Sequence, residues 1–456
     1  MKEQVPFRIT FGDAGHHAVR AAMAEKDFRL SERRIAGGVL GLLRPHERDL
    51  LRIASAVYTV DRLQKRKSSS RGISRDISLE VEVCDADFWN DPRIHGLVRS
   101  AIQQITDDFW DISFKAGGFL REEEPYFRMP FEAPTVCLYS GGLDSAAGLA
   151  TRLRTYRGPM VAVTAQHQPG QRGLVTSQLA TLATRYGTDV FPLAVRTALI
   201  NPPRMSKQES SQRCRSFLFM SLGGIVASLT GASAVEVYEN GAGVVNLPLM
   251  TGMLVGSRTT KSVHPAFLRI MSSLVSQAAG REVEFCLPYR NHTKAEITRT
   301  LAEDGLSAVA ADTVSCVHYP RRVRGSAKQC GWCPGCIGRR QAILHAGVDE
   351  HPKRYEVDLF GEAGDVASIP PGQLYYLKAM LMQVEELTHL REDGTQPDIF
   401  RRHVTGTHLL GPNEGIGPWV GVMQRYRDEW LELIQKAHRW GLVWSNWVAD
   451  LTCASS

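Results

Sequence analysis

Hydrophobic and polar residues alternate most regularly over residues 77–83, where Ile, Leu and two Val positions are separated by Ser and Glu. This two-residue period is typical of a strand with one buried face. Apolar residues recur at helical spacing over residues 46–66, and residues 7–11 have the composition of a short strand. We therefore predict an α+β domain in residues 1–130.

Nearly continuous apolar runs replace this alternation in the middle of the chain. Residues 135–139, 160–164 and 234–238 are short runs of this kind, and parallel strands that are buried on both faces have such sequences. An Ala- and Leu-rich helical pattern begins at Ala146. Residues 131–345 are predicted to form an α/β domain in which helices cover both faces of a parallel sheet.

One apolar stretch approaches the length of a membrane span. Residues 217–235 carry no charge over 19 positions, and a spanning helix needs about 20 residues. The stretch also contains several Ser, Gly and Thr residues, and Gly231 can end a helix. We predict a buried helix followed by a buried strand, and we expect a cytoplasmic protein without a membrane segment.

The last region, residues 346–456, is more polar and is predicted to be mostly helical, with helices over residues 373–391 and 420–440. A long loop is expected between residues 406 and 417, and loops of this length are often functional. Five Trp residues gather near the end; we predict that they lie in the core, with a partner surface as the alternative. They are Trp419, Trp430, Trp440, Trp444 and Trp447.

Composition adds few constraints. The 456 residues are enough for two or three domains. Hydrophobic residues make up 43% and charged residues 22%, as in ordinary globular proteins. The net charge of +6 is compatible with a phosphate-bearing ligand and does not by itself indicate nucleic acid. The first residues lack the apolar run of a secretory signal.

The most informative segment follows the apolar run at residues 135–139. It is Ser140-Gly141-Gly142-Leu143-Asp144-Ser145, a glycine turn between a predicted strand and a predicted helix. Glycines let the backbone approach a ligand closely, and the free N–H groups of a new helix face negative charge. The two Ser hydroxyls can add donors, and Asp144 can position a metal ion. A turn that merely joins strand and helix is the alternative. The lysine-loop mode of phosphate binding is excluded, because the chain has no Gly-Lys pair.

Four of the nine cysteines are closely spaced, in the pattern C-x13-C-x2-C-x2-C. This spacing predicts a closed tetrahedral zinc site, with an iron–sulfur cluster or a redox pair as alternatives. The four are Cys316, Cys330, Cys333 and Cys336. The nearby basic residues, which include Arg339 and Arg340, are typical of a solvated surface, although they could also screen phosphates.

The remaining five cysteines are scattered, and most of them have apolar or strand-like neighbours. We predict that they are buried small hydrophobic residues rather than ligands. They are Cys84, Cys137, Cys214, Cys286 and Cys453.

These motifs together resemble a known family. The segment from Ser140 to Ser145 resembles the signature loop of the PP-loop ATP pyrophosphatases, and the Cys-Gly-x-Cys-x-x-Cys knuckle resembles that of the 7-cyano-7-deazaguanine synthase (QueC) family among them. Other segments resemble further motifs of that family: Gly170-Gln171-Arg172, Arg215-Ser216-Phe217, Thr293-Lys294-Ala295-Glu296-Ile297 and Ser315-Cys316. The resemblance covers residues 134–345, which is about the size of one domain.

The resemblance implies a PP-loop fold with a zinc knuckle and an ATP-dependent ligase activity. Enzymes of this family adenylate the carboxylate of 7-carboxy-7-deazaguanine and release pyrophosphate. Ammonia then gives an amide, and the amide is activated again to give the nitrile. The implied cofactors are ATP, Mg²⁺ and Zn²⁺, and the implied substrate is a small deazaguanine-type molecule.

Site residues follow partly from the resemblance and partly from position. The expected catalytic residues are Asp144, Lys294 and Arg215. The expected nucleotide-binding residues are Ser140, Gly141, Gly142, Leu143, Asp144, Ser145, Gln166, Arg172, Glu239 and Asn240. Gln166, His167, Gln171, Glu239 and Asn240 all follow predicted strands, and ligands of open α/β sheets bind at such ends. Thr293 is the expected N-cap of the helix that carries Lys294. His264 and Arg269 are weaker candidates.

The chain departs from the family pattern on the substrate side. The family's Gly-Tyr-Pro-Asp-Cys segment is replaced by Glu239-Asn240-Gly241-Ala242-Gly243, Ser216 replaces an Asn, and the first gap between the cysteines is longer. The acceptor and the product are therefore open: the reaction could stop at an amide, or use an amine other than ammonia, including one on a protein.

The N-terminal region, joined to such a core, resembles the QueC-like proteins of bacterial antiviral defence operons. This resemblance suggests a role in antiviral defence or deazapurine metabolism, with a protein partner in a defence complex. The alternatives are a tRNA-modifying PP-loop enzyme and a non-catalytic nucleotide-binding subunit of a defence complex.

Overall fold

The computed structural model describes residues 7–11, 17–21, 24–30, 43–66, 74–117, 135–166, 170–199, 208–209, 211–249, 261–319, 328–361, 371–391 and 398–448. His167, the 321–324 part of the basic run and Cys453 lie outside these residues.

Ten strands of the described residues form one sheet, in the order β10-β9-β6-β7-β8-β3-β2-β1-β4-β5. Their bounds are β1 (Phe7–Phe11), β2 (His17–Ala21), β3 (Ala24–Leu30), β4 (Asp76–Val83), β5 (Phe109–Ala116), β6 (Thr135–Leu138), β7 (Met160–Gln166), β8 (Val190–Leu199), β9 (Ala234–Val237) and β10 (Glu284–Cys286). The half from β10 to β8 is entirely parallel. The strands predicted from the alternating and apolar runs are confirmed.

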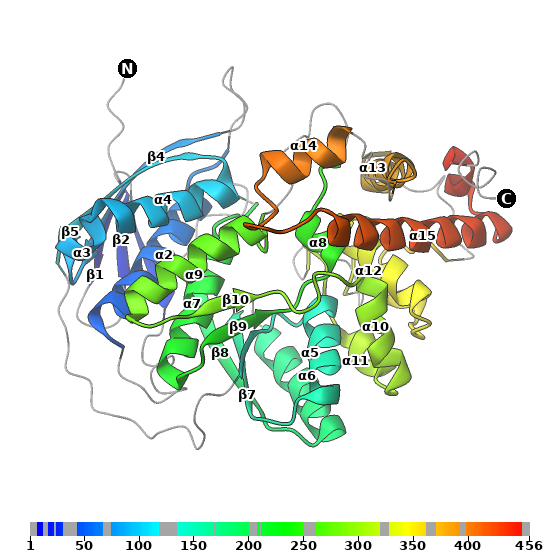
Figure 1. The fold of residues 1–456 in the computed structure, drawn as a ribbon, viewed down its shortest axis with the longest axis horizontal. Helices are drawn as coiled ribbons and strands as arrows, with labels where there is room; N and C mark the ends of the chain where they lie inside the picture. Colours follow the sequence, from blue (N-terminus) through cyan, green and yellow to red (C-terminus); the bar gives the residue numbers. More distant parts are fainter. Residues whose placement is uncertain are drawn as a thin grey trace.

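The N-terminal strands extend the same sheet. β3 pairs with β8 in antiparallel register, with Phe28 opposite Leu199, and β1, β2 and β3 form antiparallel pairs. β4 and β5 add in parallel beyond β1. Figure 1 shows these elements at one end of the molecule, the parallel strands in the middle and the C-terminal helices at the other end.

Helices account for most of the rest of the described chain. They are α2 (Pro45–Leu63), α3 (Ala86–Asn90), α4 (Pro92–Thr106), α5 (Leu143–Thr155), α6 (Gln171–Tyr186), α7 (Arg215–Thr230), α8 (Gly241–Val245), α9 (Pro265–Ala279), α10 (Lys294–Glu303), α11 (Ser307–Asp312), α12 (Pro334–His345), α13 (Pro371–Leu387), α14 (Asp398–Gly406) and α15 (Gly417–Arg439), with the 3₁₀ helices η2 (Pro352–Arg354) and η4 (Val443–Val448).

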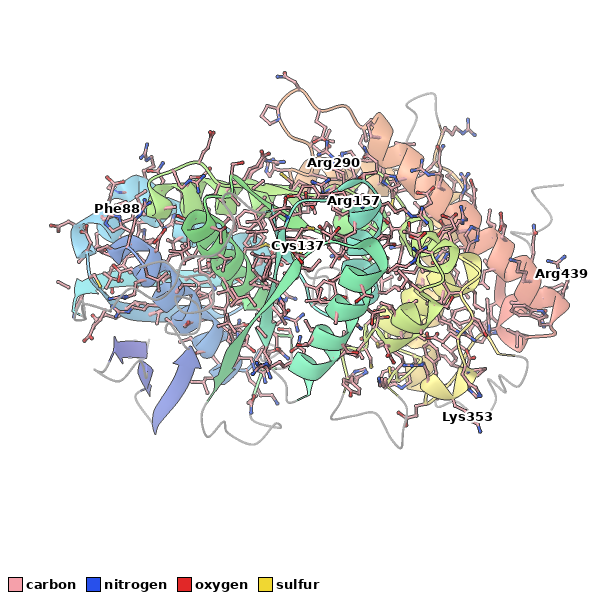
Figure 2. All side chains as sticks on the ribbon, turned by 90° about the horizontal axis from the view of Figure 1, so that it is seen from below. Phe88, Cys137, Arg157, Arg290, Lys353 and Arg439 are labelled. Atoms are coloured by element: carbon pink, nitrogen blue, oxygen red, sulfur yellow. The ribbon has the colours of Figure 1, made fainter. Side chains whose placement is uncertain are left out.

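Helices cover both faces of the parallel strands, as predicted. Alternate residues of β6 point to opposite faces: Val136 and Leu138 join a core with α2, α4, α7 and α9, whereas Cys137 joins a core with α5, α6, α10 and α12. Viewed from below, Cys137 lies near the middle of the molecule, with Phe88 toward one end and Arg439 at the other (Figure 2).

The uncharged stretch at residues 217–235 is divided as predicted. α7 ends at Thr230, Gly231 has a φ of +78°, and β9 begins at Ala234. The positive φ suits glycine, which has no Cβ to clash with the backbone. Among the described residues, no helix combines the length and the apolar character that crossing a membrane requires.

The C-terminal helices form a third core together with α8 and Ile337 of α12. Trp419, Trp430 and Trp444 are fully buried in it, which confirms the core prediction for these three. Trp440 and Trp447 are each 40% exposed, so the same prediction is wrong for them. Helix α14 lies just before the expected loop, whose residues 407–416 are outside the helices.

Candidate active site and metal centre

The Ser-Gly-Gly-Leu-Asp-Ser segment forms a tight loop between β6 and α5. Gly141 has a φ of +80°, and Gly142 is the N-cap of α5, so Leu143, Asp144 and Ser145 belong to the first turn of the helix. The hydroxyls of Ser140 and Ser145 are 2.9 Å apart. A helix that begins at a glycine has no side-chain cap, and its first N–H groups are directed at whatever anion lies beyond them.

Residues 314–315 contact this loop and help to fix its shape. The Val314 amide donates to the Gly141 carbonyl at 3.1 Å, and the Leu143 amide donates to the Ser315 hydroxyl at 3.4 Å. Gln171, on the first turn of α6, donates from its side chain to the Ser140 carbonyl at 3.2 Å. The loop is thus held in shape by backbone and side-chain contacts from two neighbouring segments.

Three elements bring charged and polar side chains together beside the loop. Asp144 comes from α5, Glu239 and Asn240 follow β9, and Lys294 is the first residue of α10. The Lys294 Nζ is 2.5 Å from Asp144 Oδ2, and the Asn240 amide donates to Asp144 Oδ1 at 2.8 Å and to Glu239 Oε1 at 2.7 Å. Four of the expected site residues therefore form one cluster at the carboxyl edge of the parallel strands.

The cluster has unusual electrostatics. Burial raises the pKa of Glu239 to about 8, and the Asp144 carboxylate acts in the same direction, against the attraction of Lys294. Burial also lowers the pKa of Lys294, but the attraction of Asp144 and Glu239 outweighs burial and the net direction is upward. Lys294 therefore stays charged beside the Asp144 carboxylate, whereas Glu239 is mostly protonated near neutral pH.

The other expected residues lie at varied places. Gln166 ends β7, and Arg172 is exposed on the first turn of α6, next to Gln171. Arg215 is the first residue of α7, and its titratable neighbours are Tyr58 and Arg62 of α2, which are not members of the Asp144 cluster.

The weaker candidates have structural partners. His264 caps α9 by accepting from the Ala266 amide, and Arg269 donates to the carbonyls of His408 and Leu410.

The four clustered cysteines come together as predicted. All are buried, and their sulfur atoms lie within 4.8 Å of one another. The Sγ atoms of Cys330 and Cys336 are 3.8 Å apart, which matches the separation of about 3.8 Å between two thiolates that bind one zinc ion at about 2.3 Å in tetrahedral geometry. The Cys333 amide donates to Cys330 Sγ at 3.4 Å, which supports a thiolate there. The residues present thus fit a structural zinc ion.

The prediction of a solvated basic surface beside the cysteines is wrong. Arg339 and Arg340 are buried rather than part of a solvated basic surface, because Glu350 and Asp358 pair with them inside the fold.

Among the scattered cysteines, Cys137 and Cys214 are buried as predicted. Cys84 and Cys286 are only half-buried, since each lies at the end of a strand or just beyond it.

Sequence reasoning missed one contributor to the site, α15. Its Glu429 accepts from the Thr293 hydroxyl, next to Lys294, and its Arg425 donates to Glu296 at 2.7 Å. The available signal was a Glu among the apolar positions of an amphipathic helix, beside Tyr426 and Trp430.

Comparison with known families gives one match. Residues 262–347 match the family model described as "Queuosine biosynthesis protein QueC". The matched part includes Lys294 and the four clustered cysteines, and it does not reach the loop at residues 140–145. The match supports membership of the QueC-like family and, in general terms, an ATP-using enzyme. None of the curated proteins compared with the chain matches it.

Proposed function

We propose that this chain is an ATP-dependent, QueC-like enzyme that adenylates the carboxylate of a 7-deazaguanine-type substrate. A carboxylate oxygen attacks the α-phosphorus of ATP and pyrophosphate leaves. An amine then attacks the acyl adenylate, so that AMP leaves, a C–N bond forms and the amine loses a proton. The amine is ammonia or a larger amine, one on a protein included.

The observation that carries the proposal is the cluster beside the glycine loop. The loop offers N–H groups from the start of α5 and two hydroxyls, which suits the pyrophosphate part of ATP. The ammonium group of Lys294 lies within 2.5 Å of Asp144, where it can turn to a phosphate oxygen or to the charge that develops on the leaving group.

Mg²⁺ fits the same cluster. Asp144 and Glu239 are two carboxyl groups on one side of the loop, and Mg²⁺ is bound by one or two carboxylates together with phosphates. When bound, it would neutralise the phosphate charge. The four cysteines would hold Zn²⁺, whose part is structural because four thiolates leave no open position.

Residues 313–316 join the zinc site to the glycine loop. Cys316 is one of the four proposed zinc ligands, and the adjacent Ser315 and Val314 contact Leu143 and Gly141 of the loop. The proposed zinc site therefore holds the segment that shapes the proposed phosphate site.

On the defence-operon resemblance, we further propose a role in antiviral defence or deazapurine metabolism, with a protein partner as one source of the amine.

The test is the release of AMP and pyrophosphate from ATP, with and without 7-carboxy-7-deazaguanine. We expect substrate-dependent AMP in the wild-type protein and a loss of about a hundredfold or more in Asp144→Asn. Asp87→Asn, an exposed acidic residue of α3, is the matched control and should keep full activity. Mass spectrometry of the product then identifies the amine. ATP binding without AMP under any of these conditions would contradict adenylation of this substrate.

A further inference from the structure

Glu429 is a buried carboxyl group that the proposed reaction does not use. It lies in α15 and is only 5% exposed. Its carboxylate accepts one hydrogen bond from the Thr293 hydroxyl and one from the Gln341 side-chain amide, the latter at 3.0 Å. Burying a carboxyl group costs free energy unless its oxygens are well used, and here both oxygens have uncharged donors from two other helices.

Thr293 connects Glu429 to the site. It is the N-cap of α10, where its hydroxyl accepts from the Glu296 amide at 3.1 Å and its own amide donates to the Glu296 carboxylate at 2.8 Å. The next residue is Lys294, whose ammonium group contacts Asp144. The direction of the Lys294 side chain therefore depends on the contacts that fix the position of Thr293.

Two more residues on the same side of α15 touch the site. Arg425 donates to Glu296 at 2.7 Å and also to the Asn291 carbonyl. Val422 packs so closely on Gly241 that a Cβ atom at residue 241 would lie 2.7 Å from its Cγ2. The Gly241 amide donates to the His292 carbonyl at 2.8 Å. Helix α15 thus supports both the segment after β9 and the start of α10.

We propose that Glu429 is a positioning residue for Lys294. By fixing the Thr293 cap of α10, Glu429 keeps the Lys294 ammonium group against Asp144. This inference rests on the proposed function and adds a requirement to it: the C-terminal helix, outside the family match at residues 262–347, completes the active site. Gln341 belongs to α12, the helix that begins within the metal-binding cysteines, so Glu429 also joins the metal centre to Lys294.

The first test is the reactivity of the Lys294 amine in the full-length protein without substrate. The protein is acetylated with the N-hydroxysuccinimide ester of acetic acid, and each lysine is followed by mass spectrometry. In the wild-type protein Lys294 should react slowly, because its side chain is only 19% exposed, while Lys115, which is also ion-paired but is 59% exposed, should react faster. In Glu429→Leu the Lys294 rate should rise about fivefold or more, as expected for a weakened helix cap, with Lys115 unchanged.

Two comparison variants separate positioning from general damage. Glu429→Gln should behave like the wild-type protein, because its amide can keep both hydrogen bonds if Gln341 turns its own amide over. Glu432→Leu removes a carboxylate that lies one turn along the same helix. This carboxylate is well exposed and pairs with His345 at 3.4 Å, so its loss should also leave the Lys294 acetylation rate unchanged.

The second test removes the other partner. Thr293→Val keeps the side-chain volume and loses the hydroxyl, so it should reproduce the effect of Glu429→Leu, whereas Thr293→Ser should not. If Glu429→Leu does not fold, Glu429→Ala takes its place, because Thr293→Val removes the cap of α10 together with the contact to Glu429. Unchanged Lys294 reactivity in the folded Thr293→Val or Glu429→Leu protein overturns the inference.

Kinetics separate this inference from the proposed function. In AMP release, kcat of Glu429→Leu should fall about tenfold or more, while KM for ATP should change less, because the glycine loop is untouched. Glu429→Gln should restore kcat. A wild-type protein that releases no AMP would contradict the proposed function, whereas the acetylation result would still decide the role of Glu429.

Discussion

Replacing Arg339 by Met tests how α12, the helix that carries Cys336 of the four-cysteine cluster, is held in the fold. The Arg339 and Glu350 side chains are both completely buried, and their charged groups are 2.6 Å apart. Arg339 also donates to the Ala310 carbonyl at 2.8 Å and to the Thr313 hydroxyl at 3.3 Å. It therefore joins α12 to residues 310–313, directly before Val314, whose amide contacts the glycine loop.

The expected loss in the free energy of unfolding follows from the partners that Glu350 still has in the variant. After Arg339→Met, the Glu350 carboxylate retains the Tyr355 hydroxyl at 2.8 Å and the more distant Arg340 guanidinium at 3.7 Å, but it loses the Arg339 guanidinium at 2.6 Å. Removing one partner of a buried ion pair typically costs about 3–5 kcal/mol. Adding Glu350→Gln removes the unpaired charge, so the double variant should be less destabilised than the sum of the two single variants, by about 2 kcal/mol.

Native-state hydrogen exchange with mass spectrometry measures this cost locally, with zinc present in excess. Peptides from residues 310–316 and 334–345 should exchange more than about a hundredfold faster in Arg339→Met. Arg354→Met is the control, since Arg354 pairs with Asp312 at the surface, and its loss should cost less than about 1 kcal/mol. A cost below about 1 kcal/mol for Arg339→Met, or simple additivity in the double variant, would refute the reasoning.

Three further predictions concern the metal, the pH dependence and the backbone near the site. Removing zinc with a chelator, or Cys330→Ser, should weaken ATP binding about fivefold or more in calorimetry, because Ser315 loses its fixed place behind the glycine loop; unchanged affinity in zinc-free folded protein would contradict this. Burial lowers the pKa of His264 from 6.5 to about 3, so folding stability should fall as pH drops below about 6.5, by about 1.4 kcal/mol per unit. His264→Asn, which can still cap α9, should flatten that part of a denaturation-against-pH curve, and an unchanged curve would exclude His264 as the cause. Gly241→Ala should lower the melting temperature and AMP release, because its Cβ would lie 2.2 Å from the Arg290 carbonyl oxygen, whereas Gly96→Ala in α4 meets no atom within 4 Å and should change neither.

Much of the fold could be predicted because its signals are local. The strand before Ser140 and the capping box of Thr293 with Glu296 each depend on residues within a few positions of one another. The same holds for three of the four metal-ligand candidates. The helical pattern predicts a start at Ala146, but α5 begins three residues earlier, at Leu143, because a phosphate-type loop and the first turn of its helix share the same residues.

The division at residues 130 and 345 stays a prediction, as do the roles of individual residues toward ATP. The sequence offers no local sign that β3 pairs with β8 and thereby extends the parallel sheet with the N-terminal strands. Strand order depends on which faces can be buried together, and this is a property of the assembled core.

Short-range sequence patterns specify the main elements and the chemistry they carry: a glycine turn before a helix, a capped lysine and a cluster of thiols. Which of these groups meet depends on how distant segments pack together. Asp144, Glu239 and Lys294 are far apart in the chain and join because β6 and β9 are neighbours and α10 packs on α5. Glu429 and Arg339 became buried because partners from distant segments satisfy their charge or hydrogen bonds. Local preferences act over a few residues, whereas the cost of burying a polar group depends on every segment that surrounds it.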